Sequence, residues 1–320
     1  MDGQARRLSD AMNFKQLEYF VTVAELGSFS KAAVALDIAQ PALSRQVRAL
    51  EVELRETLLL RNGRGVSLTE TGEQLFEHAT AILRQVALAR EDLGANREEP
   101  VGRITLGLPP SMSRQLTLPL IDTFQRQLPK ARLAVVEGLS SHIGEWITSG
   151  RVDIGLLYNP EANPGLEVCP LLQEPLCLVE RDDGRHGAQD LAPLPFSALA
   201  GRPLVLPERQ HVIRRLLDNQ ATLVGVRLDI AWEVSSVASI IDLVCAGYGH
   251  AVLTASGVAA SGRQDALRVR PVISPSVQTV LCLATSAHRR SSNLMRHACD
   301  LLQGLVAGLP QGSAAQSLPG

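Results

Sequence analysis

The stretch SKAAVALDIAQPALSRQVRAL, residues 30–50, most constrains the fold because it predicts two short helices joined by a tight turn at Asp37-Ile38-Ala39. In the second helix one face is apolar, since its large side chains recur every three or four residues: Leu43, Val47, Leu50 and Leu54. The opposite face carries Pro41, Ser44, Arg45 and Arg48. Such a helix fits the major groove of DNA. A solvated helix of an ordinary bundle has the same pattern, so the segment alone leaves both interpretations open.

Charge narrows where DNA contact would occur. The whole chain carries a net charge of −2, and residues 12–94 hold nine Arg/Lys against eleven Asp/Glu. Only residues 41–64 are locally basic, with five Arg against three Glu. Any DNA contact must therefore use one small surface rather than a basic domain.

A β-hairpin is expected directly after these helices. Two apolar pieces, 58–60 and 66–68, flank Asn62-Gly63, a dipeptide typical of a tight turn. This wing would carry Arg61 and Arg64 at its tip, within reach of backbone phosphates or a minor groove. Alternatively, both are solvated loop charges.

Local signals predict where the neighbouring helices begin and end. Gly27 is expected to close a first helix, and Ser30 to cap the second. Thr69 is expected to cap a long helix that runs to Gly94. In that helix apolar residues alternate at steps of four and three, as in a coiled-coil seam: Leu75, Ala79, Ile82, Val86, Ala89 and Leu93. The seam favours dimerisation, which would present two recognition helices to a two-fold DNA site; packing on its own domain is the alternative.

From Val101 the pattern changes to strands alternating with helices, which predicts an α/β domain of parallel sheets with helices on both faces, arranged as two lobes. Two separate strands are expected near 166–172 and 176–180. A polar linker is expected at 95–100, and disorder at 1–11 and 309–320.

Composition excludes several classes of protein. Hydrophobic residues make up 45 % and charged residues 20 %, as in a globular chain. No apolar run reaches membrane length, and the first eleven residues lack the apolar core expected of a signal peptide. The expected location is the cytoplasm. The five cysteines form no CxxC pair and predict buried free thiols rather than a redox pair. The seven histidines have no metal-site spacing, and no P-loop, GxSxG or complete dinucleotide motif occurs, so neither a catalytic site nor a cofactor or metal is expected.

The chain resembles the LysR-type transcriptional regulators. The resemblance covers about residues 12–308 and is strongest in FKQLEYFVTVAELGSFSKAAVALDIAQPALSRQVRALE and LLLRNGRGVSLTETGEQL. RVDIGLLY and VSSVASIIDLVCAGYGHAVL are similar to the family's effector-domain pattern, and GLPPSMSRQLTLPL and LPERQHVIRR to its nitrogen-assimilation-control subgroup. Two positions depart from the family: Ala39 stands where Ser or Thr is common, and Thr254 where Pro is common.

The resemblance implies a domain order. A winged helix-turn-helix domain would span residues 12–68, a linker and dimerisation helix 69–94, and an effector-binding domain 101–308. That last domain would have two periplasmic-binding-protein-like lobes, lobe I at 101–168 plus 274–308 and lobe II at 169–273, with the ligand cleft between them. By the same resemblance DNA would meet Gln40, Pro41, Ser44, Arg45 and Arg48 of the third helix, with Arg61 and Arg64 as wing contacts.

Candidate ligand groups lie in four strand-to-helix loops of the second domain, where helix N-termini offer free N–H groups and a positive dipole end. They are Ser111, Ser113, Ser140, Ser141, Gln210, His211, Ser235 and Ser236. Each pair is equally well explained as helix caps without a ligand. If the four loops converge on one cleft, a small anionic effector is favoured.

The leading hypothesis is thus a dimeric or tetrameric transcription regulator that binds double-stranded promoter DNA and senses a small effector. A constitutive regulator whose second domain only assembles subunits is the alternative among binding proteins. An enzyme with a DNA-binding appendage is the alternative from another class.

Overall fold

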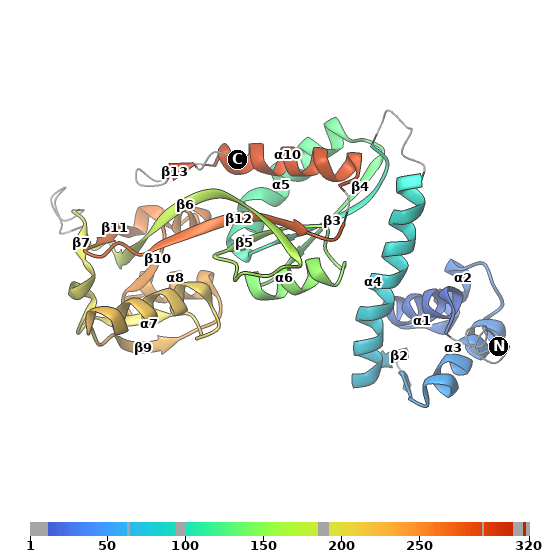
Figure 1. The fold of residues 1–320 in the computed structure, drawn as a ribbon. Helices are drawn as coiled ribbons and strands as arrows, with labels where there is room; N and C mark the ends of the chain where they lie inside the picture. The colour runs from blue at the N-terminus through green and yellow to red at the C-terminus, as the bar shows by residue number, and fades with distance from the viewer. Residues whose placement is uncertain are drawn as a thin grey trace. The chain divides into compact units, whose positions relative to one another are not determined.

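The computed structural model describes residues 12–62, 65–93, 100–184, 192–289, 291–309 and 316–317. The chain divides into two compact units, the first formed by the first 96 residues and the second by nearly all that follow. Each unit is described separately (Figure 1).

The first unit begins with the three predicted helices, α1 (Phe14–Leu26), α2 (Phe29–Ala35) and α3 (Gln40–Leu54). Gly27 ends α1 in the left-handed conformation, as predicted. The predicted cap of α2 is wrong: Ser28, not Ser30, accepts the Lys31 N–H at 3.3 Å. The helix begins earlier because Phe29, its first residue, is buried in the core of this unit.

Helix α3 follows a turn in which Asp37 adopts a φ of 52°. Its Leu43, Val47 and Leu50 are almost fully buried, as the spacing predicts, and pack against α1 and α2. Leu54, by contrast, is 36 % exposed. The apolar face thus ends one turn before the helix does.

The wing consists of the antiparallel strands β1 (Leu59–Asn62) and β2 (Gly65–Leu68). Asn62, predicted to lie in the turn, is instead the last residue of β1 and pairs with Gly65, while Gly63 lies outside the described residues. The Glu51 carboxylate on α3 accepts the N–H groups of Leu58 at 2.9 Å and Leu59 at 3.2 Å, which fixes the wing against α3.

Helix α4 (Glu70–Leu93) begins as predicted, because the Thr69 hydroxyl accepts the Gly72 N–H at 2.9 Å. A Cβ at position 72 would lie 2.1 Å from the Leu58 carbonyl oxygen, so glycine permits the close approach of this helix to the wing.

The proposed seam on α4 needs correction. Ala79 is fully buried in the unit's own core, and Leu75 packs there too. Phe76 and Leu83 pack against the same core, whereas Ile82, one turn beyond Ala79, is 37 % exposed. The first part of the predicted seam therefore packs within the chain, while the side chains of Ala89 and Leu93 lie outside the described part.

The second unit is built on a sheet with the strand order β4-β3-β5-β12-β6-β11-β7, in which β10 and β13 also pair with β6. Its strands are β3 (Gly102–Leu108), β4 (Ala131–Glu137), β5 (Ile154–Tyr158), β6 (Leu166–Arg181), β7 (Leu194–Pro195), β10 (Ala251–Thr254), β11 (Leu267–Ile273), β12 (Gln278–Ser286) and β13 (Gln316–Ser317). A separate parallel pair, β8 (Pro203–Leu206) and β9 (Asp229–Glu233), forms a bridge between Leu204 and His250, the residue before β10.

Two sequence predictions fail in this sheet. The segments 166–172 and 176–180 are one continuous 16-residue strand, β6, rather than two. The sheet is also mixed rather than parallel, because β12 runs antiparallel to both β5 and β6.

Helices cover the sheet as alternating strands and helices predict. Strands β3, β4 and β5 are covered by α5 (Pro110–Gln127), α6 (Ser140–Thr148) and α10 (Asn293–Ala307). α5 and α10 pack on one core and α6 on another, which places α6 on the opposite side of the strands (Figure 1). The part of the unit that contains β7 to β11 has α7 (Val212–Val224), α8 (Val237–Cys245), the short α9 (Ala255–Ala260) and two 3₁₀ turns, Phe196–Leu199 and Gln264–Ala266.

Separate hydrophobic cores mark two lobes within this unit. Along β6, Leu172 belongs to the first core and Leu176 to the second. Where the chain passes back through β12, Val277, just before the strand, belongs to the second core and Leu281 to the first. The change of core thus falls a few residues later than the expected lobe boundaries at 168 and 273.

Several expectations concern other parts of the chain. The segments 1–11 and 95–99 lie outside the described residues. Of the tail expected to be disordered, Gln316 and Ser317 form β13 beside β6. Among the described residues, no helix is both long enough and apolar enough to cross a membrane.

Candidate functional site

Helix α3 presents the polar face that the sequence predicts. Gln40, Pro41, Arg45 and Arg48 are exposed and Ser44 is half-buried, while the leucine face lies in the core. Ala39 precedes the helix without a side-chain hydrogen bond to its first turn. The N-terminal N–H groups of α3 are therefore not capped by a side chain and lie beside the polar face. Of the wing candidates, the Arg61 side chain and all of Arg64 lie outside the described residues.

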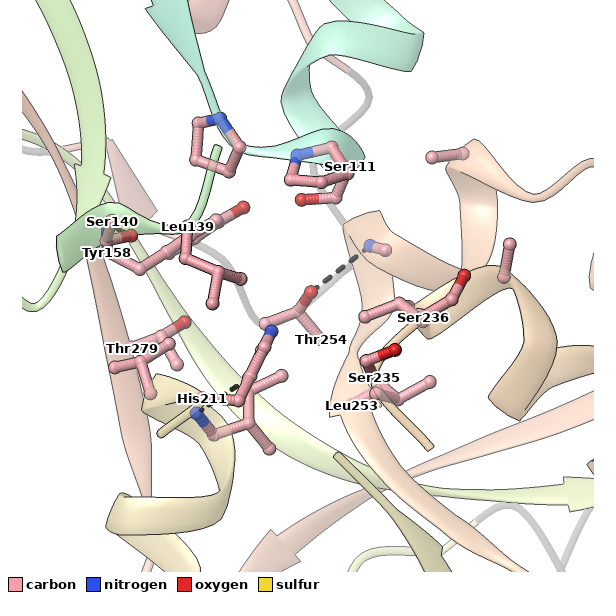
Figure 2. A pocket seen from close by; sticks show the side chains of 18 of the residues that line it. Ser111, Leu139, Ser140, Tyr158, His211, Ser235, Ser236, Leu253, Thr254 and Thr279 are labelled. Atoms are coloured by element: carbon pink, nitrogen blue, oxygen red, sulfur yellow. Dashed lines mark hydrogen bonds between the residues drawn. The ribbon is translucent and has the colours of Figure 1, made fainter. Parts of the chain in front are cut away.

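A cavity of about 670 Å³ lies in the second unit where four helices begin (Figure 2). Residues at or just before the first turns of α5, α6, α7 and α8 line it. Seven of the eight candidate ligand residues are among them: Ser111, Ser140, Ser141, Gln210, His211, Ser235 and Ser236. The predicted convergence of the four loops is therefore present in the fold.

Ser113, the eighth candidate, does not line the cavity. Its side chain is buried and its hydroxyl donates to the Glu137 carboxylate at 2.7 Å. Ser113 is expected in a strand-to-helix loop, but α5 begins at Pro110, so Ser113 lies inside the helix. Its role is to hold Glu137, which does line the cavity.

Several cavity residues also stabilise the surrounding fold. The Ser140 hydroxyl accepts the Tyr158 N–H at 2.9 Å, and His211 Nδ1 accepts the Ile213 N–H at 3.2 Å as the cap of α7. Ser236 caps α8. The interpretation of these residues as helix caps is thus correct for His211 and Ser236, and it coexists with their position on the cavity wall.

The electrostatics of the cavity come from few charged groups. Burial, reinforced by the nearby Arg215 charge, lowers the pKa of His211 to about 4, so its ring is neutral near pH 7. Arg114 and Arg215 line the cavity; their guanidinium groups contact the Ser261 carbonyl at 3.4 Å and the Glu161 carboxylate at 2.9 Å.

Sequence reasoning missed several polar groups in the wall, among them Tyr158, Thr254 and Thr279 (Figure 2). Tyr158 ends strand β5 at the edge where the loops converge, a position that could have identified it. Thr254 caps the short helix α9, accepting the Gly257 N–H at 3.1 Å. Thr279 lies inside β12, where no local signal distinguishes it.

The Tyr158 hydroxyl is the notable polar atom in this wall. It is buried and has no hydrogen-bond partner among the described residues. Burial raises the pKa of Tyr158, and the charge of Glu174 raises it further. The phenol therefore stays protonated and offers an O–H donor.

Glu174 is buried beside this wall. Its carboxylate accepts the Ser256 hydroxyl at 2.7 Å and the Ser256 N–H at 3.3 Å. Burial raises the pKa of Glu174, and the two bonds from Ser256 oppose that shift.

The cysteines match the sequence prediction in part. All five are free thiols, but only Cys177 and Cys282 are buried, and the other three are half-buried. Burial, with the charge of Glu174, raises the pKa of the Cys177 thiol to about 12. The described residues contain no group of three or more His, Cys, Asp or Glu arranged to hold a metal ion.

Comparison with known families agrees with this architecture. Residues 14–73 match the family model "Bacterial regulatory helix-turn-helix protein, lysR family", and residues 97–307 match "LysR substrate binding domain". The second match alone covers most of the chain.

Curated relatives match along nearly the whole length. The nitrogen assimilation regulatory protein nac of Klebsiella aerogenes is 32 % identical over 298 residues, which cover 92 % of this chain and 96 % of that protein. The HTH-type transcriptional regulator BbuR of Bordetella bronchiseptica is 30 % identical and aligns with 94 % of this chain and 90 % of its own.

Solved structures share the fold. A full-length OxyR variant from Pseudomonas aeruginosa has a TM-score of 0.70 at 24 % identity and covers 93 % of this chain and 95 % of its own. CbnR in complex with its target DNA has a TM-score of 0.65 at 23 % identity, with 92 % of this chain and all of its own covered. The chain belongs to the LysR family and is a DNA-binding transcriptional regulator with an effector-binding domain.

Proposed function

We propose that this regulator binds promoter DNA through the exposed face of α3 and binds a small effector with a carboxylate or similar anionic group in the cavity of its second unit. Because it would bind promoter DNA, we place it in the cytoplasm. Effector binding would favour one arrangement of the two lobes and so change how the protein binds and bends its promoter.

The convergence of four helix N-termini on one cavity carries the effector proposal. Backbone N–H groups at a helix start carry a partial positive charge, so several of them aimed at one volume favour an anion. Hydroxyls of Ser111, Ser140 and Tyr158 add donors, and the neutral His211 adds neither charge nor repulsion. A cavity of about 670 Å³ holds a molecule of metabolite size.

The arrangement of α3 supports the DNA proposal. Arg45 and Arg48 lie on the face opposite the buried leucines, so the guanidinium groups are available to guanine edges or phosphates without disturbing the core. Gln40, Pro41 and Ser44 complete the surface that we assign to DNA, with Arg61 and Arg64 proposed for the wing. The solved complex of CbnR with its target DNA shows that a relative of this fold binds DNA.

Self-association follows from the same hypothesis. A two-fold operator needs two copies of α3 at a fixed spacing. Ile82 remains exposed on α4 and, with Val86, is our candidate for the contact between copies. Substitution of Ile82 by Glu should shift the protein toward monomer, which light scattering coupled to gel filtration measures directly.

A thermal-shift screen of small carboxylates and amino acids tests the effector proposal. A binding effector should raise the unfolding midpoint of the wild type and of the control Ser197→Ala, an exposed serine away from the cavity. It should raise that of Ser111→Ala much less. If no compound in the screen shifts the wild type, the constitutive alternative, in which the second unit only assembles subunits, is favoured.

A further inference from the structure

A buried carboxylate near the end of β6 is surrounded by four basic side chains. Glu180, whose side chain is 6 % exposed, lies 2.9 Å from Arg202 and 3.4 Å from His250. Arg268 and Arg270 on β11 approach the other carboxylate oxygen at 3.7 Å and 3.5 Å. β11 pairs with β6 so that Arg268 lies directly opposite Glu180. The four basic residues come from three segments, the turn before β8, the residue before β10, and β11.

This cluster has more hydrogen-bond donors than acceptors. The Nε atoms of Arg202 and Arg270 donate to the carbonyls of Ala198 and Ala192. Arg268 Nε and His250 Nδ1, however, are buried and have no hydrogen-bond partner among the described residues. One carboxylate cannot serve three guanidinium groups that carry five N–H donors each.

The cluster also has unbalanced charge. Arginine remains protonated in proteins, so among the described residues three guanidinium groups face one carboxylate. Burial lowers the pKa of His250, and Arg202 and Arg268 lower it further against the opposite effect of Glu180, so the histidine adds no charge near neutral pH. Partly buried positive charge without a counter-ion is unfavourable, and a second anion would relieve it.

We infer that the Glu180 cluster is a second ligand site, which binds a small oxyanion of the phosphate type. Guanidinium forks suit the oxygens of such an ion, and the side chains of Arg202 and His250, 32 % and 29 % exposed, keep the cluster open to solvent. None of its residues lines the effector cavity, so this inference does not depend on the proposed effector.

Calorimetric titration of inorganic phosphate into the full chain, at ionic strength fixed with chloride, tests the inference. The wild type should bind phosphate, and Arg202→Gln and Arg270→Gln should each bind about tenfold more weakly or not at all. Two controls should bind as the wild type does. Arg263→Gln removes an exposed arginine that pairs only with Asp242 among the described residues, and the double variant Arg45→Ala, Arg48→Ala excludes the proposed DNA face as the source of binding.

Glu180→Gln provides the sharper test. Removing the competing carboxylate should tighten phosphate binding several-fold, because the three arginines then lack their internal acceptor. A variant that folds only when phosphate is present also supports the site. If Glu180→Gln folds neither in phosphate nor in chloride, phosphate binding by Arg202→Gln and Arg270→Gln decides whether the site exists. Absence of phosphate binding to the wild type, or equal binding by Arg202→Gln and Arg270→Gln, would overturn the inference.

Discussion

Helix α3 and the effector cavity organise their polar residues in opposite ways. On α3 the residues that hold the fold and those assigned to DNA occupy different faces: Leu43 and Val47 are buried, whereas Arg45 and Arg48 are exposed. In the cavity the same side chains serve both purposes, since Ser140 and His211 line it while accepting backbone N–H groups. Substitutions on α3 should therefore separate binding from stability, and substitutions in the cavity should couple them.

The largest effect is expected on DNA binding. Loss of a base contact costs about 1–3 kcal/mol, so Arg45→Ala combined with Arg48→Ala should abolish specific binding. Fluorescence anisotropy on a promoter fragment at fixed salt measures this, and thermal unfolding should stay within about 0.5 kcal/mol of the wild type. Arg126→Ala, at an exposed arginine of the second unit, controls for the loss of a surface positive charge elsewhere. A double variant that still footprints the promoter like the wild type would show that α3 is wrongly oriented in our proposal.

The opposite face of α3 should respond only in stability. Leu43 is fully buried, so Leu43→Ala should lower the free energy of unfolding of the first unit by about 2–5 kcal/mol. Val52→Ala on the same helix, at a valine that is 70 % exposed, should change it by less than about 0.5 kcal/mol. Denaturant titration followed by circular dichroism compares the two. Similar losses for both variants would mean that the buried face of α3 has been misassigned.

His211 should make the stability of the second unit depend on pH. Its folded pKa of about 4 lies below the ordinary value of 6.5, so between these values the unfolded chain binds a proton that the folded chain does not. Stability from this group is complete above pH 6.5 and falls as the pH drops toward 4, by at most roughly 3 kcal/mol. His211→Asn keeps a capping side chain and should flatten this part of the profile. Denaturant titrations at pH 7 and pH 4.5 measure the difference, and an unchanged pH profile in the variant would argue against a buried neutral ring.

Ser140 should show the coupling on a smaller scale. Ser140→Ala leaves the Tyr158 N–H without its acceptor, which should cost about 1–3 kcal/mol of stability in addition to any loss of effector affinity. The neighbouring Ser141 is exposed and accepts no backbone N–H from the part of the chain that the structure describes, so Ser141→Ala should stay within about 0.5 kcal/mol. Parallel thermal melts compare the two serines. Equal stability of both variants would remove the structural role of Ser140.

The same contrast explains how far the sequence predicts the molecule. The elements of the first unit follow from local periodicity and caps, because each of α1, α3 and α4 buries one face against its neighbours in sequence. Errors there are small: the cap of α2 moves from Ser30 to Ser28 because burial of Phe29 extends the helix. Only part of the apolar stripe on α4 is left for our proposed contact between copies, because Ala79 is buried in the core of the first unit.

In the second unit, pairing between strands that are distant in sequence limited what could be predicted. Pro170 and Pro175 indicate a break in the strand, yet β6 continues through both because β12 pairs along it with a register shift between Leu281 and Cys282. The four cavity loops could be predicted, since each lies between a strand and a helix. The contributions of Tyr158, Thr254 and Thr279 could not be predicted together, because only tertiary packing brings β5, β10 and β12 to one wall.

The most direct test of two separate sites measures promoter affinity and effector affinity on the same variants. The promoter fragment comes from genome-wide mapping of bound sites, and the effector is the carboxylate with the largest shift in the thermal screen. Arg45→Ala combined with Arg48→Ala should lose the promoter and bind the effector as the wild type does. Ser111→Ala should bind the promoter normally and the effector about tenfold more weakly. Loss of effector binding in the first variant, or of promoter binding without effector in the second, would contradict the assignment of DNA to α3 and of the effector to the cavity.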